Sequence, residues 1–245
     1  MDTLLRLRAA LSLVQWSDLR ARPAICPLCG PSVIVQLNVS AIGVRCLRCS
    51  ASAITMSLVS ILRQELESLE NLHVYELSSR GPLVAWLRRH AGQVTCSEYF
   101  DGVGAGETLN GVQCQDVQLL TYAAASFDAC TSTEVFEHVP DDLRGFAELY
   151  RVLRPGGRLV FSVPMSPRAA TVERAFWKDG VIHHLLPPEY HGDHIRGQGR
   201  VLAYRNYGLD ILDRVRAAGF SDVRIVKPMH WLGRWAGQPI IVATA

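Results

Sequence analysis

The sequence predicts an α/β protein in which a doubly wound, mostly parallel sheet follows a small N-terminal cysteine module. From residue 71 onward, short apolar runs typical of buried strands alternate with helical patterns. Before residue 50, four of the seven cysteines stand in two C-x-x-C pairs. The chain of 245 residues is 49% hydrophobic and 20% charged, which is typical of a globular protein with one core domain and a small module.

The first segment, residues 3–21, shows the apolar spacing of an amphipathic helix. It does not resemble a signal peptide, because Asp2 replaces a basic start and Arg6 and Arg8 interrupt the apolar stretch. Eighteen uncharged apolar residues never occur in succession. We therefore expect a cytoplasmic protein that does not cross a membrane, in which thiols stay reduced.

Residues 24–50 contain the two cysteine pairs around a β-like stretch at 33–39. Each C-x-x-C turn directs two thiolates toward one point, and two such turns complete a tetrahedral sulfur shell that suits Zn²⁺. Four thiolates leave no open position for water, so the predicted zinc is structural. The alternative is two unrelated pairs of free cysteines. The predicted metal ligands are Cys26, Cys29, Cys46 and Cys49.

The remaining pattern predicts two regions, residues 1–70 with the cysteine module and a linker helix over 54–70, and residues 71–245 with the sheet. Strands are expected at 72–77, 94–100, 111–117, 126–133, 158–163, 223–226 and 240–244. Helices are expected at 84–90, 141–153 and 209–218. Residues 165–206 are rich in Pro, Gly and His and are expected to be irregular.

Acidic residues recur at the carboxyl ends of the first four predicted strands of the sheet: Glu76, Glu98, Asp116 and Glu134. Ligands of doubly wound sheets bind at this edge. A carboxylate after the second strand can accept both hydroxyls of a ribose, and one after the third can accept from an adenine amine. For any single acid, a capping or solvated loop residue is the alternative. Four acids at matching positions of successive strands favour a nucleotide-type site.

At these positions the sequence resembles the class I S-adenosylmethionine-dependent methyltransferases. The resemblance covers about residues 70–245 and is most specific in two segments, EVFEHVPD at 134–141 and ELYRVLRPGG at 148–157. It implies a Rossmann-like sheet of seven strands in the order 3-2-1-4-5-7-6, S-adenosyl-L-methionine as cofactor, and methyltransferase activity.

The resemblance also implies roles for individual residues. The methionine part of the cofactor is expected beside Glu76 and the loop of Ser78, Ser79 and Gly81. Glu98, followed by Tyr99, is expected to hold the ribose. Asp116 is expected to meet the adenine amine while Val117 packs on the ring. Thr133 and Glu134 are expected to line the amino-acid end.

The first motif departs from the family pattern E-x-G-x-G-x-G. Ser78, Arg80 and Pro82 occupy the glycine positions, and Gly81 is out of register. Glycine lets a backbone approach a ligand closely, so the departure bears on how the cofactor is held. Ser78 and Ser79 can hydrogen-bond the methionine carboxylate in place of that close approach.

For the acceptor, His138 is the expected general base, because histidine accepts protons near neutral pH. Its alternative is a helix-start histidine bonded to backbone. Family members insert acceptor-binding elements where residues 165–206 lie. We expect substrate contacts there from His183, His184, Tyr190 and His191. A divalent-cation site at His191, Asp193 and His194 is an alternative to substrate binding.

We expect a small-molecule acceptor and O-methylation, in natural-product or saccharide biosynthesis, and a homodimer as the assembly. An RNA methyltransferase that grips RNA with its zinc module is one alternative. Against it, residues 1–70 carry seven arginines and five acids, and the whole chain has a net charge of only +2. A degenerate fold that serves as a scaffold without transferring methyl groups is the other.

Overall fold

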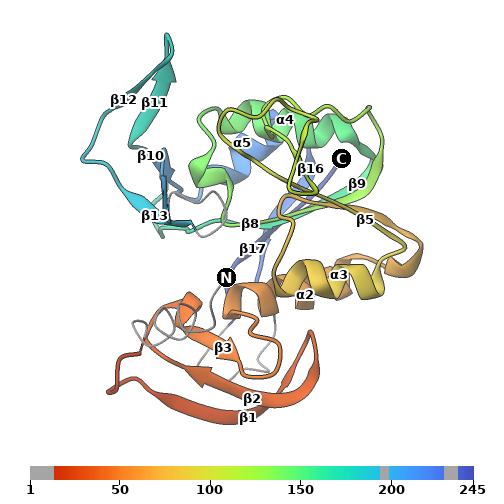
Figure 1. The fold of residues 1–245 in the computed structure, drawn as a ribbon, viewed down its shortest axis with the longest axis vertical. Coiled ribbons are helices and arrows are strands. Elements are labelled where there is room, and N and C mark those ends of the chain that lie inside the picture. The colour runs from red at the N-terminus through yellow and green to blue at the C-terminus, as the bar shows by residue number, and fades with distance from the viewer. Residues whose placement is uncertain (1–13, 194–198, 229–236) are drawn as a thin grey trace.

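The structure is a computed structural model, and it describes residues 14–193, 199–228 and 237–245. Its centre is an eight-stranded sheet (Figure 1). In spatial order the strands are β16 (Ser221–Val226), β17 (Ile240–Thr244), β9 (Leu153–Ser162), β8 (Phe127–Thr133), β4 (His73–Glu76), β5 (Gln93–Glu98), β7 (Val112–Cys114) and β6 (Thr108–Leu109).

This order confirms the predicted topology. Counted along the chain from β4, the strands lie in the order 3-2-1-4-5-7-6, and β6 adds a short antiparallel edge beyond β7. The central pairings, from β7 through β5, β4 and β8 to β9, are all parallel. Strand β17 runs antiparallel to both β9 and β16. The carboxyl ends of the central strands therefore meet at one edge.

Helices cover both faces of the sheet. On one face lie α2 (Ala53–Glu65) and α3 (Pro82–His90), and on the other lie α4 (Asp142–Val152) and α5 (Ile211–Ala217) (Figure 1). Neighbouring strand residues point to opposite faces, as in any pleated strand. Val74 belongs to the core beneath α2 and α3, whereas the next residue, Tyr75, belongs to the core beneath α4. The sheet is therefore buried on both sides.

The cysteine module is a three-stranded antiparallel sheet of β1 (Arg20–Cys26), β2 (Gly30–Gln36) and β3 (Val44–Cys46). Here the prediction of a helix over 3–21 is wrong in the described part, because residues 14–19 are not helical and Arg20 begins β1. Residues 1–13 lie outside the described part. The strand predicted at 33–39 is confirmed, three residues earlier, as β2.

The module packs on α2, whose buried face continues into the core of the main sheet. Helix α2 begins at a Ser52 cap that accepts from the Thr55 amide, and it ends at Glu65, earlier than predicted. A short 3-10 turn, η2 (Leu69–Asn71), leads into β4. The division of the chain after residue 70 stays a prediction about domain organisation.

Residues 165–206 are more regular than predicted. They form three two-stranded ribbons, in which β10 (Val172–Glu173) pairs with β15 (Arg205–Asn206), β11 (Ala175–Lys178) with β12 (Val181–His184), and β13 (Tyr190–Asp193) with β14 (Gly199–Leu202). The ribbon of β11 and β12 projects from the body of the molecule (Figure 1). Turn residues at Asp179 and Gly180, both with positive φ, close this ribbon, and such residues are equally common in irregular loops.

None of the described helices combines the length and apolar character that a membrane span requires.

Candidate active site and metal centres

The four cysteines of the C-x-x-C pairs converge on one point. The sulfur atoms of Cys26 and Cys49 lie 3.7 Å apart, those of Cys29 and Cys46 lie 3.6 Å apart, and all four lie within 4.8 Å of one another. Four sulfurs at 2.3 Å from a central zinc ion are separated by about 3.8 Å in a tetrahedron. The sulfur positions therefore fit a zinc ion, as the sequence predicted.

Local backbone geometry produces these two turns. Gly30, directly after the first pair, has φ of +82°, a conformation that glycine adopts without strain. The amide of Ser50 donates to the Cys46 carbonyl and closes the second turn. Burial and the neighbouring thiol of Cys46 raise the pKa of Cys29 to about 11. Hydrogen bonds from Ser32 and from nearby backbone amides instead lower the pKa of Cys46 to about 6, against the effect of burial.

At the carboxyl edge of the main sheet, Glu76 ends β4 and is almost fully buried. The hydroxyl of Thr131, on the neighbouring strand β8, donates a hydrogen bond to the Glu76 carboxyl. Burial raises the pKa of Glu76 to about 8, and the charge of Glu98 adds to that rise. Glu76 and Glu98 therefore stand close together at adjacent strand ends, as their spacing predicted.

The altered loop after β4 closes onto Glu98. The Ser79 amide and hydroxyl both donate to Oε1 of Glu98, at 2.8 and 2.9 Å. Gly81, with φ of +105°, then turns the chain into α3, which begins at Pro82. No atom outside its neighbours lies within 4 Å of a Cβ built at Gly81, so open space adjoins the loop. Ser79 therefore connects the first motif to the acid that is expected to hold the ribose.

The third strand end is held by its own loop. Asp116 accepts from the amide and the side chain of Gln118, at 2.9 and 3.0 Å. Val117 is buried and belongs to the core beneath α4. Tyr99, after β5, is 40% exposed. The proposed contacts of these residues with the cofactor stay predictions.

The fourth strand end carries hydroxyl groups that have no partner. Among the described residues, the buried side-chain oxygens of Ser132 and Thr133 accept and donate no hydrogen bond. Glu134 follows with φ of +53°, and its carboxyl accepts from Ser162 at 2.9 Å. Burial, followed by the charge of Glu137, raises the pKa of Glu134 to about 8. Such unpartnered hydroxyls fit a ligand that bonds them.

Beyond Glu134, a 3-10 turn, η3 (Phe136–His138), holds His138 against the ribbon of β13 and β14. The Nδ1 of His138 donates to the Leu202 carbonyl at 2.8 Å. Its ring meets that of His191 edge to face, with centroids 4.9 Å apart. Beside both rings lies the buried side chain of Glu137, whose Oε1 is 3.6 Å from Nε2 of His138 and 3.7 Å from Nδ1 of His191, and which sequence reasoning did not select. Its place in the motif between Glu134 and His138 was the available signal.

The structure separates the predicted acceptor residues. His191 joins the cluster with Glu137 and His138, whereas His183 and His184 lie exposed on the ribbon of β11 and β12. Tyr190 is half-exposed, beneath the guanidinium of Arg200. The alternative cation site involves His194, which lies outside the described residues. Substrate roles for these residues stay predictions.

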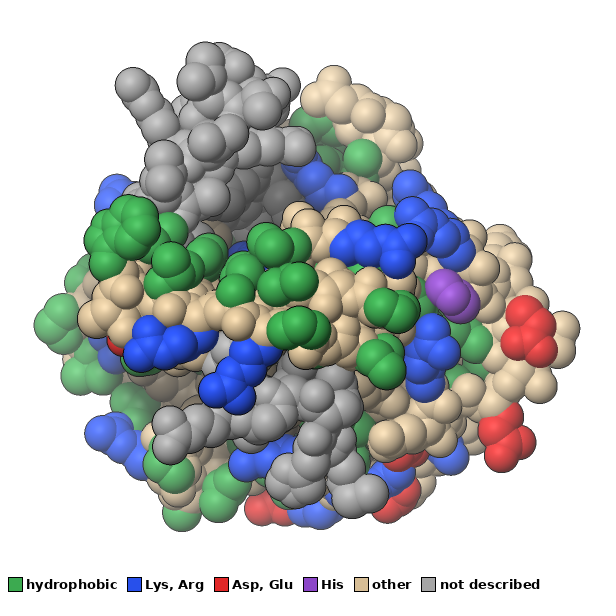
Figure 2. All heavy atoms as spheres, turned by 90° about the horizontal axis from the view of Figure 1, so that it is seen from below, with side chains coloured by type: hydrophobic (Ala, Val, Ile, Leu, Met, Phe, Trp, Pro, Cys, Tyr) green, Lys and Arg blue, Asp and Glu red, His purple; other side chains and the backbone are tan. Residues whose placement is uncertain are grey.

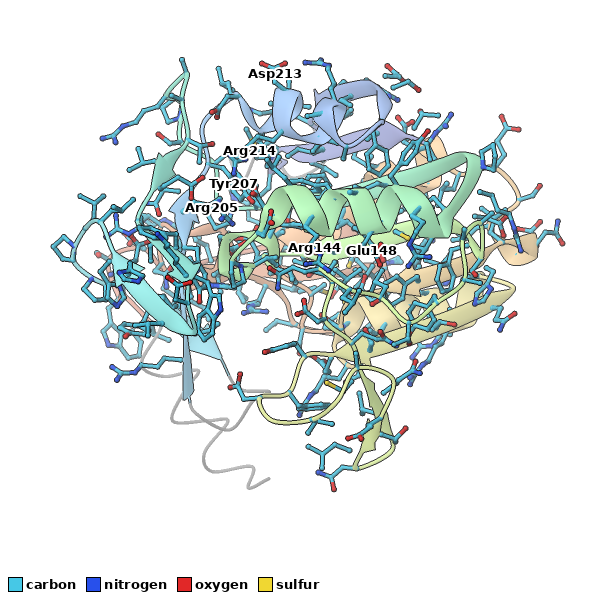
Figure 3. All side chains as sticks on the ribbon, turned by 90° about the horizontal axis from the view of Figure 1, so that it is seen from above. Arg144, Glu148, Arg205, Tyr207, Asp213 and Arg214 are labelled. Carbon is cyan, nitrogen blue, oxygen red and sulfur yellow. The ribbon has the colours of Figure 1, made fainter. Side chains whose placement is uncertain are left out.

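A buried arginine fixes the loop that carries Glu137 and His138. Arg205 of β15 donates to the carbonyls of Val139 and Pro140 at 2.5 and 2.7 Å, and it pairs with Glu173 at 3.1 Å. It lies beside Tyr207 and Arg214 at the start of α4 (Figure 3). The residues 165–206 are thereby attached to the carboxyl edge of the sheet.

A separate cavity of about 850 Å³ lies between the first cysteine knuckle and α3. Arg48, Arg63 and Arg89 line it together with Trp86. Lysine and arginine side chains are spread among apolar ones on the underside of the molecule, where few acidic side chains are in view (Figure 2). The cavity is basic, and the acids at the strand ends are not among its lining residues.

Comparison with known proteins agrees with this topology and these motifs. Residues 78–161 match the family model described as a methyltransferase domain. This match spans the loop after β4, the ends of β5 and β7, and the EVFEHVPD and RVLRPGG segments. Residues 78–161 therefore form part of a class I S-adenosylmethionine-dependent methyltransferase domain. The predicted family and fold are confirmed, with the four-cysteine cluster as an N-terminal addition to the methyltransferase domain.

Two curated relatives of this chain are named as methyltransferases. A ubiquinone biosynthesis O-methyltransferase of Coxiella burnetii is 34% identical over 110 residues, which is 39% of this chain and 44% of the relative. A demethylmenaquinone methyltransferase of Deinococcus radiodurans is 41% identical over 75 residues, 29% of each chain. The chain thus spans less than half the length of these relatives.

Solved methyltransferases are similar at lower identity. An S-adenosylmethionine-dependent methyltransferase from Mesorhizobium loti aligns with 76% of this chain and 96% of its own, at 21% identity and a TM-score of 0.49. A Burkholderia thailandensis 1,6-didemethyltoxoflavin-N1-methyltransferase aligns with 71% of this chain and 70% of its own, at 22% identity and a TM-score of 0.40.

Proposed function

We propose that this protein transfers a methyl group from S-adenosylmethionine to a hydroxyl of a small-molecule acceptor, and that the cysteine cluster holds a structural zinc. The observation that carries the proposal is the acid series at one edge of the sheet. Glu76, Glu98 and Glu134 end or follow adjacent strands there, in the order the family uses. The region 78–161 that matches the family model contains two of these three acids.

The residues at this edge suit the cofactor. Glu98 offers carboxylate oxygens for the ribose hydroxyls, and it is held in place by Ser79. The unpartnered hydroxyl of Thr133 belongs to a residue that is expected to line the amino-acid end. Buried polar groups without partners are costly, and a bound ligand that bonds them removes this cost.

When bound, S-adenosylmethionine supplies an electrophilic methyl group on a sulfonium. The work of the protein is to align the acceptor, exclude water and remove a proton from the acceptor hydroxyl. Because the Nδ1 proton of His138 is donated to the Leu202 carbonyl, its Nε2 carries the lone pair that can accept such a proton. His191, which is 32% exposed, lies on the open side of this group.

Small-molecule acceptors among the relatives support the acceptor class. The curated relatives are named for quinone biosynthesis, and one solved relative for N-methylation of a toxoflavin precursor. For this chain we propose an O-methylated natural product or saccharide as the product. A homodimer remains the expected assembly.

Calorimetric titration with S-adenosylhomocysteine tests the proposal. We expect saturable binding, and we expect Glu98→Gln to weaken it about 10- to 100-fold, since hydrogen bonds to a charged group are worth about 1.5–3 kcal/mol. Glutamine retains an oxygen for Ser79, so the loop should stay in place. The exposed Glu70→Gln is the matched control and should bind like the unaltered protein. Folded protein that gives no binding at millimolar ligand would favour the scaffold alternative.

The RNA alternative has one specific observation in its favour, the three arginines of the cavity beside the cysteine knuckle. Phosphate contacts would make binding depend steeply on salt. Titrating a structured RNA at 50 and 200 mM salt tests this alternative. Binding that weakens with salt and is reduced in Arg48→Ala would support an RNA substrate over a small molecule.

A further inference from the structure

The basic cavity beside the first cysteine knuckle is built from three parts of the chain. The two C-x-x-C turns contribute residues 25–30 and Arg48. Helix α2 contributes Arg63, and one face of α3 contributes Trp86 and Arg89. The volume of about 850 Å³ lies in the range of small-molecule sites and is larger than a single inorganic ion needs. The cavity can therefore hold an organic ligand.

Apart from the cysteine thiols, the polar side chains that line this cavity can only donate hydrogen bonds. A guanidinium group has five N–H donors and an indole has one, and neither group has an acceptor. Among the described residues, no aspartate or glutamate lines the cavity, and none pairs with Arg48, Arg63 or Arg89. The ligand that complements such a lining is rich in acceptors and negatively charged.

Neutral groups hold two of the three guanidiniums in place. Nη1 of Arg48 donates to the Cys29 carbonyl at 2.9 Å, which leaves its other N–H groups for a ligand. The guanidinium of Arg63 lies over the Trp86 ring, 5.3 Å from its centroid. Trp86 is only 2% exposed, and its Nε1 has no hydrogen-bond partner among the described residues. A buried donor without an acceptor is costly, so an acceptor atom is what this wall lacks.

The zinc expected in the neighbouring cluster leaves positive charge in the cavity. Three of the four predicted zinc ligands, Cys26, Cys29 and Cys49, line it. A Zn²⁺ ion with four thiolates carries about two negative charges, and the three guanidiniums outnumber them. Guanidinium forks match the oxygens of a phosphate group in pairs, whereas thiolates repel them.

We propose that this cavity binds an organic phosphate, with the phosphate or diphosphate group on the three arginines. The organic part has apolar side chains to contact, because Ile25, Leu28 and Pro82 also line the cavity. A small ligand suits the site better than RNA does. The arginines gather around one cavity, whereas nucleic-acid sites spread basic residues along a face, and the whole chain has a net charge of only +2.

Calorimetric titration of the full-length, zinc-loaded protein tests the proposal with three probes: isopentenyl diphosphate, uridine diphosphate and inorganic pyrophosphate. We expect at least one organic diphosphate to bind, one per chain, more tightly than pyrophosphate. The tighter of the two organic probes shows whether the ligand is an aliphatic phosphate or a nucleotide.

Two arginine variants locate the binding. We expect Arg63→Met and Arg89→Met each to weaken it at least tenfold, because each removes charge-assisted hydrogen bonds while methionine keeps an apolar stem. Both arginines are exposed, so both variants should fold. Arg144→Met is the control, since Arg144 is an exposed arginine of α4 on the other face of the sheet, and it should bind like the unaltered protein.

Nuclear magnetic resonance of the indole N–H groups gives a second measurement. The chain has five tryptophans, and Trp86→Phe identifies the signal of Trp86. We expect the bound diphosphate to shift this signal in the unaltered protein. An unmoved Trp86 signal at saturating diphosphate would place the ligand elsewhere and overturn the inference.

Further outcomes would overturn it as well. They are the absence of binding of all three probes at millimolar concentration by folded protein, binding that both arginine variants retain, and pyrophosphate that binds as tightly as both organic probes. A structured RNA that displaces the organic diphosphates at lower concentration would assign the cavity to RNA instead. Glu98→Gln should leave diphosphate binding unchanged while it weakens S-adenosylhomocysteine binding. The diphosphate site and the proposed function can therefore fail independently.

Discussion

Replacing Arg205 with methionine tests whether a buried arginine holds the 165–206 region onto the sheet edge. Arg205 is 3% exposed, and its fork donates to the carbonyls of Val139 and Pro140. Methionine has a similar length and no donor. The substitution therefore leaves the carbonyls of Val139 and Pro140 without this partner, and it leaves the Phe136 carbonyl with Tyr207 alone of its two side-chain donors. It also removes the cation between Glu173 and Asp142.

The magnitude follows from these losses. An unsatisfied buried carbonyl costs about 1–3 kcal/mol, and breaking a buried ion pair costs about 3–5 kcal/mol when the other charge is left alone. Here Arg214 still pairs with both Asp142 and Glu173, at 2.6 and 3.0 Å, so the remaining charges are compensated. We therefore expect the free energy of unfolding to fall by about 3 kcal/mol.

The assay is urea denaturation of the unaltered protein, Arg205→Met and a control. Arg144→Met is the control, because Arg144 is an exposed arginine of α4 with Glu148 one turn away (Figure 3). We expect the control to lose less than about 0.5 kcal/mol. Arg205→Lys should lie between the two, since lysine keeps the charge without the fork. A loss for Arg205→Met no larger than that of the control would refute the reasoning.

Two further predictions concern the cysteine cluster and the buried acid of β4. Cys46→Ser should reduce bound zinc from one per chain to near zero by elemental analysis and lower the melting temperature, whereas Cys114→Ser should retain the zinc; retention by both would disprove the four-sulfur site. Because burial raises the pKa of Glu76 to about 8, the folded state keeps a proton that the unfolded state releases above about pH 4.5. Stability should therefore fall as the pH rises from about 4.5 to 8, and Glu76→Gln should show less of this fall in urea denaturation; identical pH profiles would contradict the assigned shift.

Much of the fold was predictable because its signals are local. The two C-x-x-C turns bring their sulfurs together through backbone geometry within a few residues, and Gly30 provides the positive φ that the first turn needs. Strands β4, β8 and β17 were predicted within about one residue. Of these, β17 is a mostly apolar run, as buried strands often are. The parallel order then brings Glu76 beside Glu98.

Other features depend on contacts that local patterns do not encode. The first strand of the cysteine module is mostly exposed, so it lacks the apolar alternation that identifies a strand, and the helical spacing before it was extended too far. The ribbons in 165–206 are rich in turn residues and have exposed strands for the same reason. Hydrogen bonds to a partner strand stabilise such segments, and the partner is known only once the chain has folded.

The sequence by itself determined the pairing of the four cysteines in two C-x-x-C turns and the alternation of strands and helices, because spacing and periodicity act over short stretches of chain. The strand order and the series of acids along the sheet edge were expected from the family resemblance. The tertiary structure alone decided which groups meet beyond that edge. It brought His191 to Glu137 and His138 across more than fifty residues, and it closed Arg205 onto the same loop. Burial of Glu137 brought this acid of the motif against the imidazoles of His138 and His191. Charge burial depends on how distant segments pack, and packing is a property of the whole fold.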